Sequence, residues 1–565
     1  MVLYGVPAAL GFTSGAALGA PAEQPNGAPW TFTNASVATG LGYTHTYDTS
    51  VFTPERHHIA GGLAIGDLND DGWDDLYAVT GHQFSNGVNL NPNKLFLATG
   101  DGSYIEAAAA WGLNSHDTHS AGPLIADFNG DGYNDLLVGG VEGNLLDGGV
   151  QAVSIRLYLN TGGSGFVDFT VGSKLAGLVA TTWNFGMAAA DIDGDGDLDL
   201  FITHWQSNNR KFLFRNNGLA VFTDISTTQL SNSDITNLFT PAFVDINGDG
   251  QLDLLIAGDF LNESTIGGGS RYFLNDGNGF FIDQGHPVAI PSGPNPNPLN
   301  GPDENGMGSA IADYDNDGDL DWFVSSIHDP DGVSEANWGV TGNRLYRNDG
   351  AGHFTDVTSA AGVRAGFWGW GSCFADFNND MHLDLFHVNG FRSALNGEPE
   401  FENDPARMFI SNGDGTFTEQ SVALGVADTP YGRAVLCFDN DRDGDIDILV
   451  NNNRNTARFF RNDLANGNHF ITIKLTQDLP NAAAIGATIS LTSGGISQLR
   501  VVQAGGNFSS SQPRAQHFGL GSNAAVDSIT ITWPDGQQET HTNLAVDQYV
   551  EFARGSDTVF KDGFE

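Results

Sequence analysis

The sequence predicts an all-β protein: a seven-bladed β-propeller with Ca²⁺-binding loops, followed by a small C-terminal β-sandwich. An aspartate-rich loop of nine residues recurs seven times, short apolar and aromatic segments flank each copy, and strand-like segments continue beyond the last copy without such loops. Glycine accounts for 74 of the 565 residues and aromatic residues for 11%, which favours short strands joined by tight turns. Repetition at a long period is typical of an array of similar supersecondary units.

The repeated loop carries oxygen-bearing side chains at positions 1, 3, 5 and 9. This donor set in a tight turn suits a hard cation such as Ca²⁺. The sequence excludes an EF-hand, because position 12 of that loop requires Glu and no copy has one there. Ordinary Asx-Gly turns are the alternative, but they do not by themselves account for one oxygen spacing in all copies. The copies begin at Asp67, Asp127, Asp191, Asp245, Asp313, Asp376 and Asp439, which are 60, 64, 54, 68, 63 and 63 residues apart.

The predicted Ca²⁺ ligands, for up to seven ions, are the side chains at positions 1, 3, 5 and 9 and the main-chain carbonyl at position 7. In the first three loops they are Asp67, Asn69, Asp71, Trp73 and Asp75; Asp127, Asn129, Asp131, Tyr133 and Asp135; and Asp191, Asp193, Asp195, Asp197 and Asp199. In the last four they are Asp245, Asn247, Asp249, Gln251 and Asp253; Asp313, Asp315, Asp317, Asp319 and Asp321; Asp376, Asn378, Asp380, His382 and Asp384; and Asp439, Asp441, Asp443, Asp445 and Asp447. The sixth loop has Met381 where the others have glycine. A positive φ strains a non-glycine residue, so we expect this site to be the weakest or to differ in shape.

Each repeat contains strand-like segments that predict a four-stranded antiparallel blade. Examples are a small-residue segment at 308–313, an apolar segment at 254–257, an aromatic segment at 344–350 and a Phe-Thr-Asp-Val-Thr segment at 354–358. The seventh repeat lacks the last of these, and a similar segment occurs near the N-terminus at 32–36. We therefore expect the N-terminal strand to complete the last blade, which would close the ring and leave only short sheet edges.

Together, the acidic loop, the Asn-Asp-Gly turn and the Phe-Thr-Asp-Val-Thr strand resemble the FG-GAP/VCBS repeats of integrin-α-type propellers, from about Trp30 to Asn462. The C-terminal part resembles the ASPIC/UnbV domain, through the motifs at 484–487, 505–512, 517–521 and 526–536. This combination resembles the cartilage acidic protein family, which implies an extracellular calcium-binding protein of adhesive or unknown role. We expect a leader at residues 1–29, the propeller at 30–465, the β-sandwich at 466–555 and a tail at 556–565.

The charge of the chain narrows the range of partners. The formal net charge is −45, from 68 acidic and 23 basic residues, so nucleic acid is not expected to bind. The four side-chain ligand positions of the loops hold 24 aspartates in total. Without cations these carboxylates would repel one another, so the metal-free protein should be much less stable than the loaded one.

Two further features bear on where the protein is found. The first 20 residues are small and apolar like the end of a secretory signal, although a basic n-region is missing and no segment is long enough to span a membrane. We expect secretion or export to the periplasm, because weak oxygen-ligand calcium sites fill where calcium is millimolar. The two cysteines, Cys373 and Cys437, are expected to be buried free thiols. A disulfide between neighbouring repeats is the alternative.

A second candidate site is the axial mouth on the side opposite the loops, where propellers usually bind ligands. The segments that enter the first strands carry His57, His58, His116, Asp117, His119, Trp183, Asn184, Glu304, Asn305, Trp368, Trp370, Tyr431 and Arg433. Three interpretations of this set are open. The side chains could bind a glycan or peptide by stacking and hydrogen bonding, they could hold a catalytic metal, or they could fill the top of the channel without binding a ligand. No nucleophile elbow, phosphate loop or HExxH motif occurs.

The leading hypothesis from the sequence is an extracellular Ca²⁺-binding module with a glycan or protein ligand. The alternative is an extracellular enzyme, such as a polysaccharide lyase or dehydratase, that uses the histidines and tryptophans of the mouth. The sequence leaves the oligomeric state open.

Overall fold

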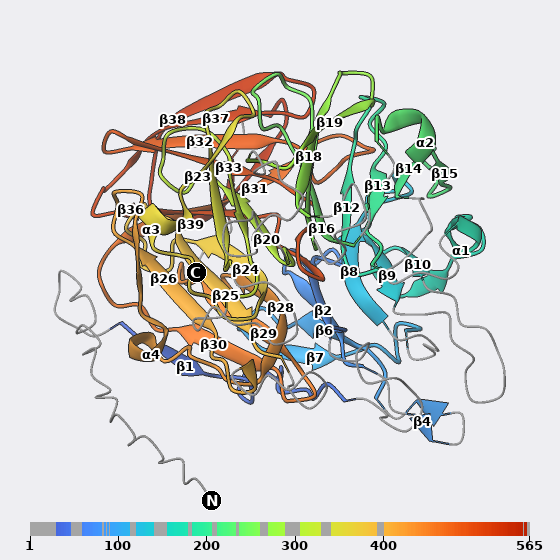
Figure 1. Ribbon diagram of the computed structural model, residues 1–565, viewed down its shortest axis with the longest axis horizontal. Coiled ribbons are helices and arrows are strands. Elements are labelled where there is room, and N and C mark those ends of the chain that lie inside the picture. Colours follow the sequence, from blue (N-terminus) through green and yellow to red (C-terminus); the bar gives the residue numbers. More distant parts are fainter. Residues whose placement is uncertain are drawn as a thin grey trace, which may run out of the picture.

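The computed structural model describes residues 30–46, 59–81, 84–85, 88–89, 91–113, 120–140, 155–178, 184–205, 212–232, 235, 237–259, 269–288, 305–328, 341–391, 401–556 and 559–561. Almost all of the described elements are strands (Figure 1). The described helices are the single turns α1 (Leu175–Leu178), α2 (Ser226–Gln229), α3 (Thr358–Ala361) and α4 (Ser421–Leu424). None of them is long and apolar enough to cross a bilayer.

Four-stranded antiparallel sheets recur along the chain, and we number each sheet and its acidic loop from 1 to 7 in chain order. Sheets 1 to 3 consist of β2 (Gly62–Gly66), β3 (Asp75–Val79), β6 (Lys94–Ala98) and β7 (Tyr104–Glu106); β8 (Ser120–Ala126), β9 (Asp135–Gly140), β10 (Ile155–Asn160) and β11 (Phe166–Asp168); and β12 (Met187–Ala190), β13 (Asp199–Ile202), β14 (Leu213–Arg215) and β15 (Thr223–Asp224). Sheets 4 to 6 consist of β16 (Leu238–Val244), β17 (Asp253–Gly258), β18 (Arg271–Asn275) and β19 (Phe281–Gly285); β20 (Ser309–Ala312), β21 (Asp321–Val324), β22 (Arg344–Asn348) and β23 (Phe354–Asp356); and β24 (Gly369–Ala375), β25 (Asp384–Asn389), β26 (Arg407–Ser411) and β27 (Phe417–Glu419). A small hairpin joins β4 (Phe84–Ser85) to β5 (Val88–Asn89).

Sheet 7 combines the two ends of the repeat region. It contains β28 (Tyr431–Phe438), β29 (Asp447–Asn453) and β30 (Arg458–Asn462), and its outer strand is β1 (Phe32–Asn34). Phe32 pairs with Asn462 and Asn34 with Phe460. A strand from the start of the chain therefore supplies the segment that the seventh repeat lacks. β28 also packs against β2 of sheet 1.

The first strand of each sheet is largely buried and consists mostly of small or apolar residues, as in β8 and β16; β28 also contains Tyr431 and Arg433. These strands lie towards the middle of the molecule in Figure 1, whereas β7, β15 and β19 lie farther out. Each acidic loop connects the first strand of a sheet to the second. The seven loops consequently lie at the same end of their sheets.

After sheet 7, a separate β domain follows. Its strands are β31 (His469–Thr476), β32 (Thr488–Ser493), β33 (Ile496–Val501), β36 (Gln516–Gly521), β37 (Val526–Thr532), β38 (Gln538–Leu544), β39 (Gln548–Ala553) and β40 (Val559–Lys561). They form two sheets, β36-β31-β39-β40 and β33-β32-β37-β38. Side chains from both sheets, including Ile471, Ile489 and Phe552, share one apolar core.

A segment of the C-terminal domain inserts among the first strands of the repeat sheets. It contains β34 (Gly506–Asn507) and β35 (Ser510–Ser511), and β35 pairs in parallel with β2, so that sheet 1 has six strands in all. Phe508 is fully buried, with its ring centroid 5.2 Å from that of Trp370 and 5.9 Å from that of Phe239. The centre of the repeat region is therefore filled by residues that lie more than forty positions after the last repeat ends.

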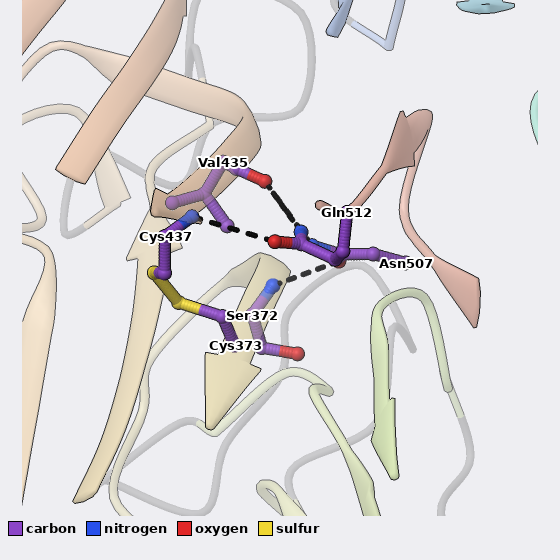
Figure 2. Close-up of a disulfide and its surroundings, with 6 residues drawn as sticks. All are labelled: Ser372, Cys373, Val435, Cys437, Asn507 and Gln512. Carbon is purple, nitrogen blue, oxygen red and sulfur yellow. Dashed lines mark hydrogen bonds between the residues drawn. A yellow bond between two sulfur atoms is a disulfide. The ribbon is translucent and has the colours of Figure 1, made fainter. Parts of the chain in front are cut away.

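The two cysteines form a disulfide between the first strands of sheets 6 and 7 (Figure 2). The expectation of two free thiols was wrong. The sequence places Cys373 and Cys437 at similar points of consecutive repeats, but it does not show that β24 and β28 pack closely enough to bring their Cα atoms to 6.4 Å. The disulfide lies beside the inserted segment, since the N–H of Ser372 donates to Asn507 Oδ1 at 3.0 Å.

Candidate metal centres

The first and last aspartates determine the shape of each acidic loop. In loop 2, Asp127 accepts a hydrogen bond from the main-chain N–H of Gly132 at 2.8 Å. Asp135 at position 9 accepts from the N–H groups of Phe128 and Asn160, both at 2.9 Å. In all seven loops the carboxylate at position 9 accepts a hydrogen bond from the third strand of its sheet. These bonds hold the turn closed and leave other carboxylate lone pairs directed into the loop.

Several loop oxygens are buried without a hydrogen-bond partner among the described residues. They are Asp193 Oδ1, Asp315 Oδ1, Asp439 Oδ1 and Asp447 Oδ2. In loops 3, 5 and 7, side-chain oxygens of three or four aspartates lie within 4.8 Å of one another: Asp191, Asp193 and Asp195; Asp313, Asp315, Asp317 and Asp321; and Asp439, Asp441 and Asp443. Converging carboxylates, with at least one buried oxygen per loop that lacks a donor, fit a hard cation and repel one another in its absence. The residues present therefore fit Ca²⁺.

Electrostatics lead to the same conclusion. Burial raises the pKa of the aspartate at position 9 in every loop, and neighbouring carboxylates of the same loop add to the shift. The pKa rises to about 7 for Asp75 and Asp253, about 8 for Asp135 and Asp199, and about 9 for Asp321, and it lies well above the usual value for Asp384 and Asp447. A metal-free loop is thus costly to keep fully ionised at neutral pH, and a bound cation would remove that cost.

The sixth loop keeps the turn conformation of the other loops, although methionine replaces the glycine at position 6. Met381 has a φ of +79°, close to the +91° of Gly132 at the same position in loop 2. The loop is also buried beneath the C-terminal domain. Asn379 Oδ1 lies 2.7 Å from His517 Nε2, and the carbonyl of Asn378 accepts hydrogen bonds from Asn466 and Asn468. That this site is the weakest stays a prediction.

The C-terminal domain covers more than the sixth loop. The guanidinium of Arg442, from loop 7, lies between the rings of Trp73 and Tyr549, 3.9 and 4.2 Å from their centroids. Arg514 donates to Asn134 Oδ1 at 2.7 Å. A cavity of about 180 Å³ remains between the loops and the domain. The sequence analysis did not predict this interface. The one feature that could have indicated it is the set of basic residues in a C-terminal domain that follows strongly acidic repeats.

A second set of contacts that the sequence analysis did not predict links consecutive sheets through asparagine side chains. Asn160, at the end of the third strand of sheet 2, donates through Nδ2 to the carbonyl of Leu68 in loop 1 at 2.8 Å. Asn216, Asn275, Asn348 and Asn462 donate in the same way to the equivalent carbonyl of the preceding loop. The recurring Asn before the turn was visible in the sequence, but its partner lies in another repeat.

The axial mouth is only partly visible. His57, His58, His116, Asp117, His119, Trp183 and Glu304 lie outside the described residues. Asn184, Asn305, Trp368, Trp370 and Arg433 are buried, and Tyr431 is partly exposed. Trp368 stacks on Phe391 with ring centroids 4.1 Å apart, and Arg433 lies 4.1 Å from the ring centroid of Trp370. These rings pack against protein groups, so a ligand site at the mouth stays a prediction.

The repeats and the C-terminal domain both match known families. An FG-GAP-like repeat model matches residues 58–138, 147–202, 191–256 and 329–387, and an ASPIC and UnbV model matches residues 477–559. The chain therefore belongs to the proteins that combine FG-GAP-like repeats with a C-terminal ASPIC/UnbV domain.

Its relatives include cartilage acidic protein 1, to which it is distantly homologous. It is 27% identical to the Mus musculus protein over 274 residues, which cover 47% of this chain and 38% of the mouse protein. It is 24% identical to the Xenopus tropicalis protein over 527 residues, which cover 88% of this chain and 75% of that protein. The matched region thus spans well under half of the mouse relative.

Solved structures resemble the chain only weakly. The rhamnogalacturonan lyase YesW aligns with 78% of this chain and 76% of its own, at 13% identity and a TM-score of 0.38. A Trypanosoma rangeli sialidase aligns with 78% of this chain and 60% of its own, at 11% identity and a TM-score of 0.34. At this level of similarity the two enzymes bear on neither substrate nor mechanism.

Proposed function

We propose that this chain is a secreted Ca²⁺-binding protein whose repeats, at residues 30–465, form a closed seven-bladed propeller with up to seven ions in its loops. The observation that carries the proposal is the convergence of aspartate oxygens in loops 3, 5 and 7, each of which has at least one buried carboxylate oxygen without a hydrogen-bond partner among the described residues. Closure of the ring is supported by the pairing of β1 with β30 and by the packing of β28 against β2. The β-sandwich, which we place at 466–555 with a tail at 556–565, packs on loops 6 and 7 of this set.

Calorimetry on the full chain tests the metal part of this proposal. A chelator should lower the melting temperature, and millimolar Ca²⁺ should restore it, because ions that bind only the folded state stabilise it. Mg²⁺ serves as the control, since it dehydrates reluctantly and demands octahedral geometry. An unchanged melting temperature after complete removal of divalent ions would reject the proposal.

We further propose that the protein acts as a binding or adhesion module for an extracellular glycan or protein, with the axial mouth as its ligand site. The support is the set of histidine and aromatic residues in the segments that enter the first strands. A glycan and protein array probed with wild type and with H58A/H119A tests this. Binding that the double variant loses supports the proposal, and wild type that binds nothing on the array argues against it. Turnover of a bound polysaccharide would instead favour the enzyme alternative.

A further inference from the structure

The seven loops fall into two classes at position 3. Loops 1, 2, 4 and 6 have asparagine there (Asn69, Asn129, Asn247 and Asn378), and loops 3, 5 and 7 have aspartate (Asp193, Asp315 and Asp441). In the asparagine class, Nδ2 donates to the carboxylate at position 5 of the same loop in every case. An aspartate cannot make this bond, and it adds a fourth carboxylate to the side-chain ligand set.

A residue in the third strand of the same sheet varies together with this class. Loops 3, 5 and 7 have Arg215, Arg347 and Arg461 there, whereas loops 1, 2, 4 and 6 have Leu97, Leu159, Leu274 and Ile410. The strand registers show that these seven positions are equivalent. Each pairs with a residue of the outer strand of its sheet that directly follows a Phe or Tyr in the sequence. In the order given above, these partners are Thr223, Thr355, Thr33, Ile105, Val167, Ile282 and Thr418. Aspartate at position 3 therefore always occurs with arginine, and asparagine always with an aliphatic residue.

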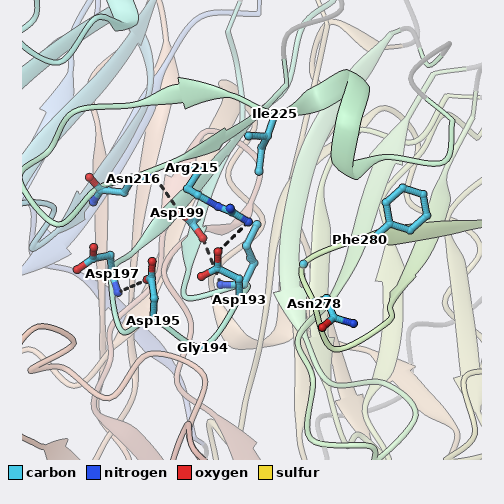
Figure 3. Close-up of polar contacts among 12 residues, drawn as sticks. Asp193, Gly194, Asp195, Asp197, Asp199, Arg215, Asn216, Ile225, Asn278 and Phe280 are labelled. Atoms are coloured by element: carbon cyan, nitrogen blue, oxygen red, sulfur yellow. Dashed lines mark hydrogen bonds and ion pairs between the residues drawn. The ribbon is translucent and has the colours of Figure 1, made fainter.

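Loop 3 shows the contact that accounts for this correspondence. Arg215 Nη2 lies 2.7 Å from Asp193 Oδ2 (Figure 3). The other oxygen, Asp193 Oδ1, is buried without a hydrogen-bond partner among the described residues. Asp193 also belongs to the group of converging oxygens in this loop. The guanidinium thus engages one carboxylate oxygen and leaves the second available to a cation.

In the other two aspartate-class loops the arginine lies near enough to act on the loop through its charge, but the ion pair of loop 3 is not repeated between Arg347 and Asp315 or between Arg461 and Asp441. Burial raises the pKa of Asp315, and Arg347 acts in the opposite direction. Asp315 Oδ1 is likewise buried without a partner among the described residues. Arg461 forms an ion pair with Asp463 at 2.7 Å, and Asp441 adds to the field that raises the pKa of this arginine.

Charge explains why the arginine is needed. The asparagine-class loops have three carboxylates at the side-chain ligand positions, and the aspartate-class loops have four carboxylates and one arginine, so the sum is three negative charges in each. The aspartate-class loops also carry Asp197, Asp319 or Asp445 at position 7, which increases the local negative charge. An uncompensated fourth carboxylate would repel the others most strongly in the metal-free protein.

We propose that Arg215, Arg347 and Arg461 support three of the Ca²⁺ sites: Arg215 is a positioning residue that orients Asp193, and all three arginines offset the charge of the fourth carboxylate of their loop. This rests on the proposed function, because the oriented oxygen is a ligand only if the loop binds a cation. The consequence is that position 3 and the third-strand residue act as one exchangeable unit.

Thermal unfolding of the full chain, in EGTA and in millimolar Ca²⁺, tests the unit in loop 3. In EGTA, R215L should lower the melting temperature by several degrees, and D193N/R215L should bring it back close to wild type, because it recreates the pair of loops 2 and 4. The Ca²⁺-induced rise in melting temperature should be larger in R215L than in wild type or the double variant, since an extra uncompensated carboxylate attracts the ion. High salt should reduce the effect of R215L in EGTA.

The reciprocal test introduces the aspartate–arginine pair into a loop of the asparagine class. N247D in loop 4 should destabilise the protein in EGTA, and adding L274R should restore most of the loss. R271L is the matched control, because Arg271 also lies in a third strand but pairs at 2.7 Å with Asp283, outside any loop. The loss of stability in R271L should be the same in EGTA and in Ca²⁺, and adding D193N should not restore it.

The outcomes separate the two proposals. If D193N/R215L is as unstable in EGTA as R215L, or if L274R does not rescue N247D, the positioning proposal is wrong. If wild type shows no response to Ca²⁺ while both rescues occur in EGTA, the calcium proposal fails and the arginines only balance charge.

Discussion

Loops 3 and 6 have the same nine-residue spacing and use it differently. Loop 3 lies at the surface, with Asp195 exposed, four carboxylates at its ligand positions and an arginine that orients one of them. In loop 6, Asp376 and Asn379 are both only 2% exposed, because the C-terminal domain packs on them. One turn geometry therefore provides a candidate cation site in one repeat and a docking surface for another domain in a second. The difference comes from position 3 of the loop and from the residues outside the loop that pack on it.

Removal of calcium should have the largest effect and should affect the two loops differently. If each site stabilises the fold by mass action, complete chelation should lower the melting temperature by about 10 °C or more. Native mass spectrometry at rising free Ca²⁺ should show site 6 filling last, because Met381 occupies a glycine conformation there. If all sites fill at the same free Ca²⁺ concentration, loops 3 and 6 do not differ in Ca²⁺ affinity and the prediction is wrong.

The next effect is the pH dependence of the metal-free protein. Aspartates whose folded pKa values are raised to about 7 to 9 stabilise the fold when they are protonated. Their contribution is fully present below about pH 4, the pKa of the unfolded chain, and is lost as the pH rises through about 7 to 9. In EGTA, the melting temperature should thus be higher near pH 5 than near pH 8. With Ca²⁺ the order should reverse, since protons compete with the ion.

Removal of the Phe508 side chain, which inserts among the repeat sheets, should lower the stability of the protein less than removal of the ions. Phe508 is fully buried among rings of the repeat sheets, so F508A should reduce the free energy of unfolding by about 3–5 kcal/mol. Urea unfolding measures this. The control is L219A, at a leucine that is 66% exposed, which should change the value by less than about 0.5 kcal/mol. Equal effects of the two variants would show that the insertion contributes little to stability.

The smallest expected effect comes from the two contacts that Asn379 of loop 6 makes, one with loop 7 and one with the C-terminal domain. Asn379 Nδ2 donates to the carbonyl of Gly444 at 2.9 Å, and Oδ1 contacts His517. Since Asn379 has a φ of +56°, N379G removes both contacts without backbone strain, and should cost about 1–3 kcal/mol in urea unfolding. D70G is the matched control at the same position of loop 1, where Asp70 has a φ of +59° and is exposed. A loss as large in D70G would attribute the effect to the turn itself.

Much of the fold follows from local patterns that the sequence displays directly. The loop spacing, the apolar first strands and the Phe-Thr-Asp segments each depend on residues close together in the chain, and the recurring sheets have the strands predicted from them. The carboxylate set of each candidate site was equally visible. The cysteine prediction failed because the distance between β24 and β28 depends on how two sheets pack, which no local pattern encodes.

By itself, the sequence determined the repeat, its all-β character, the acidic loops and the segment at 32–36 that completes sheet 7. The tertiary structure alone decided which residues from distant parts of the chain meet: Asn160 with Leu68, Cys373 with Cys437, and Phe508 with the rings around it. The physical reason is that strand and turn preferences act over a few residues, whereas these contacts join surfaces that become neighbours only after the sheets have packed.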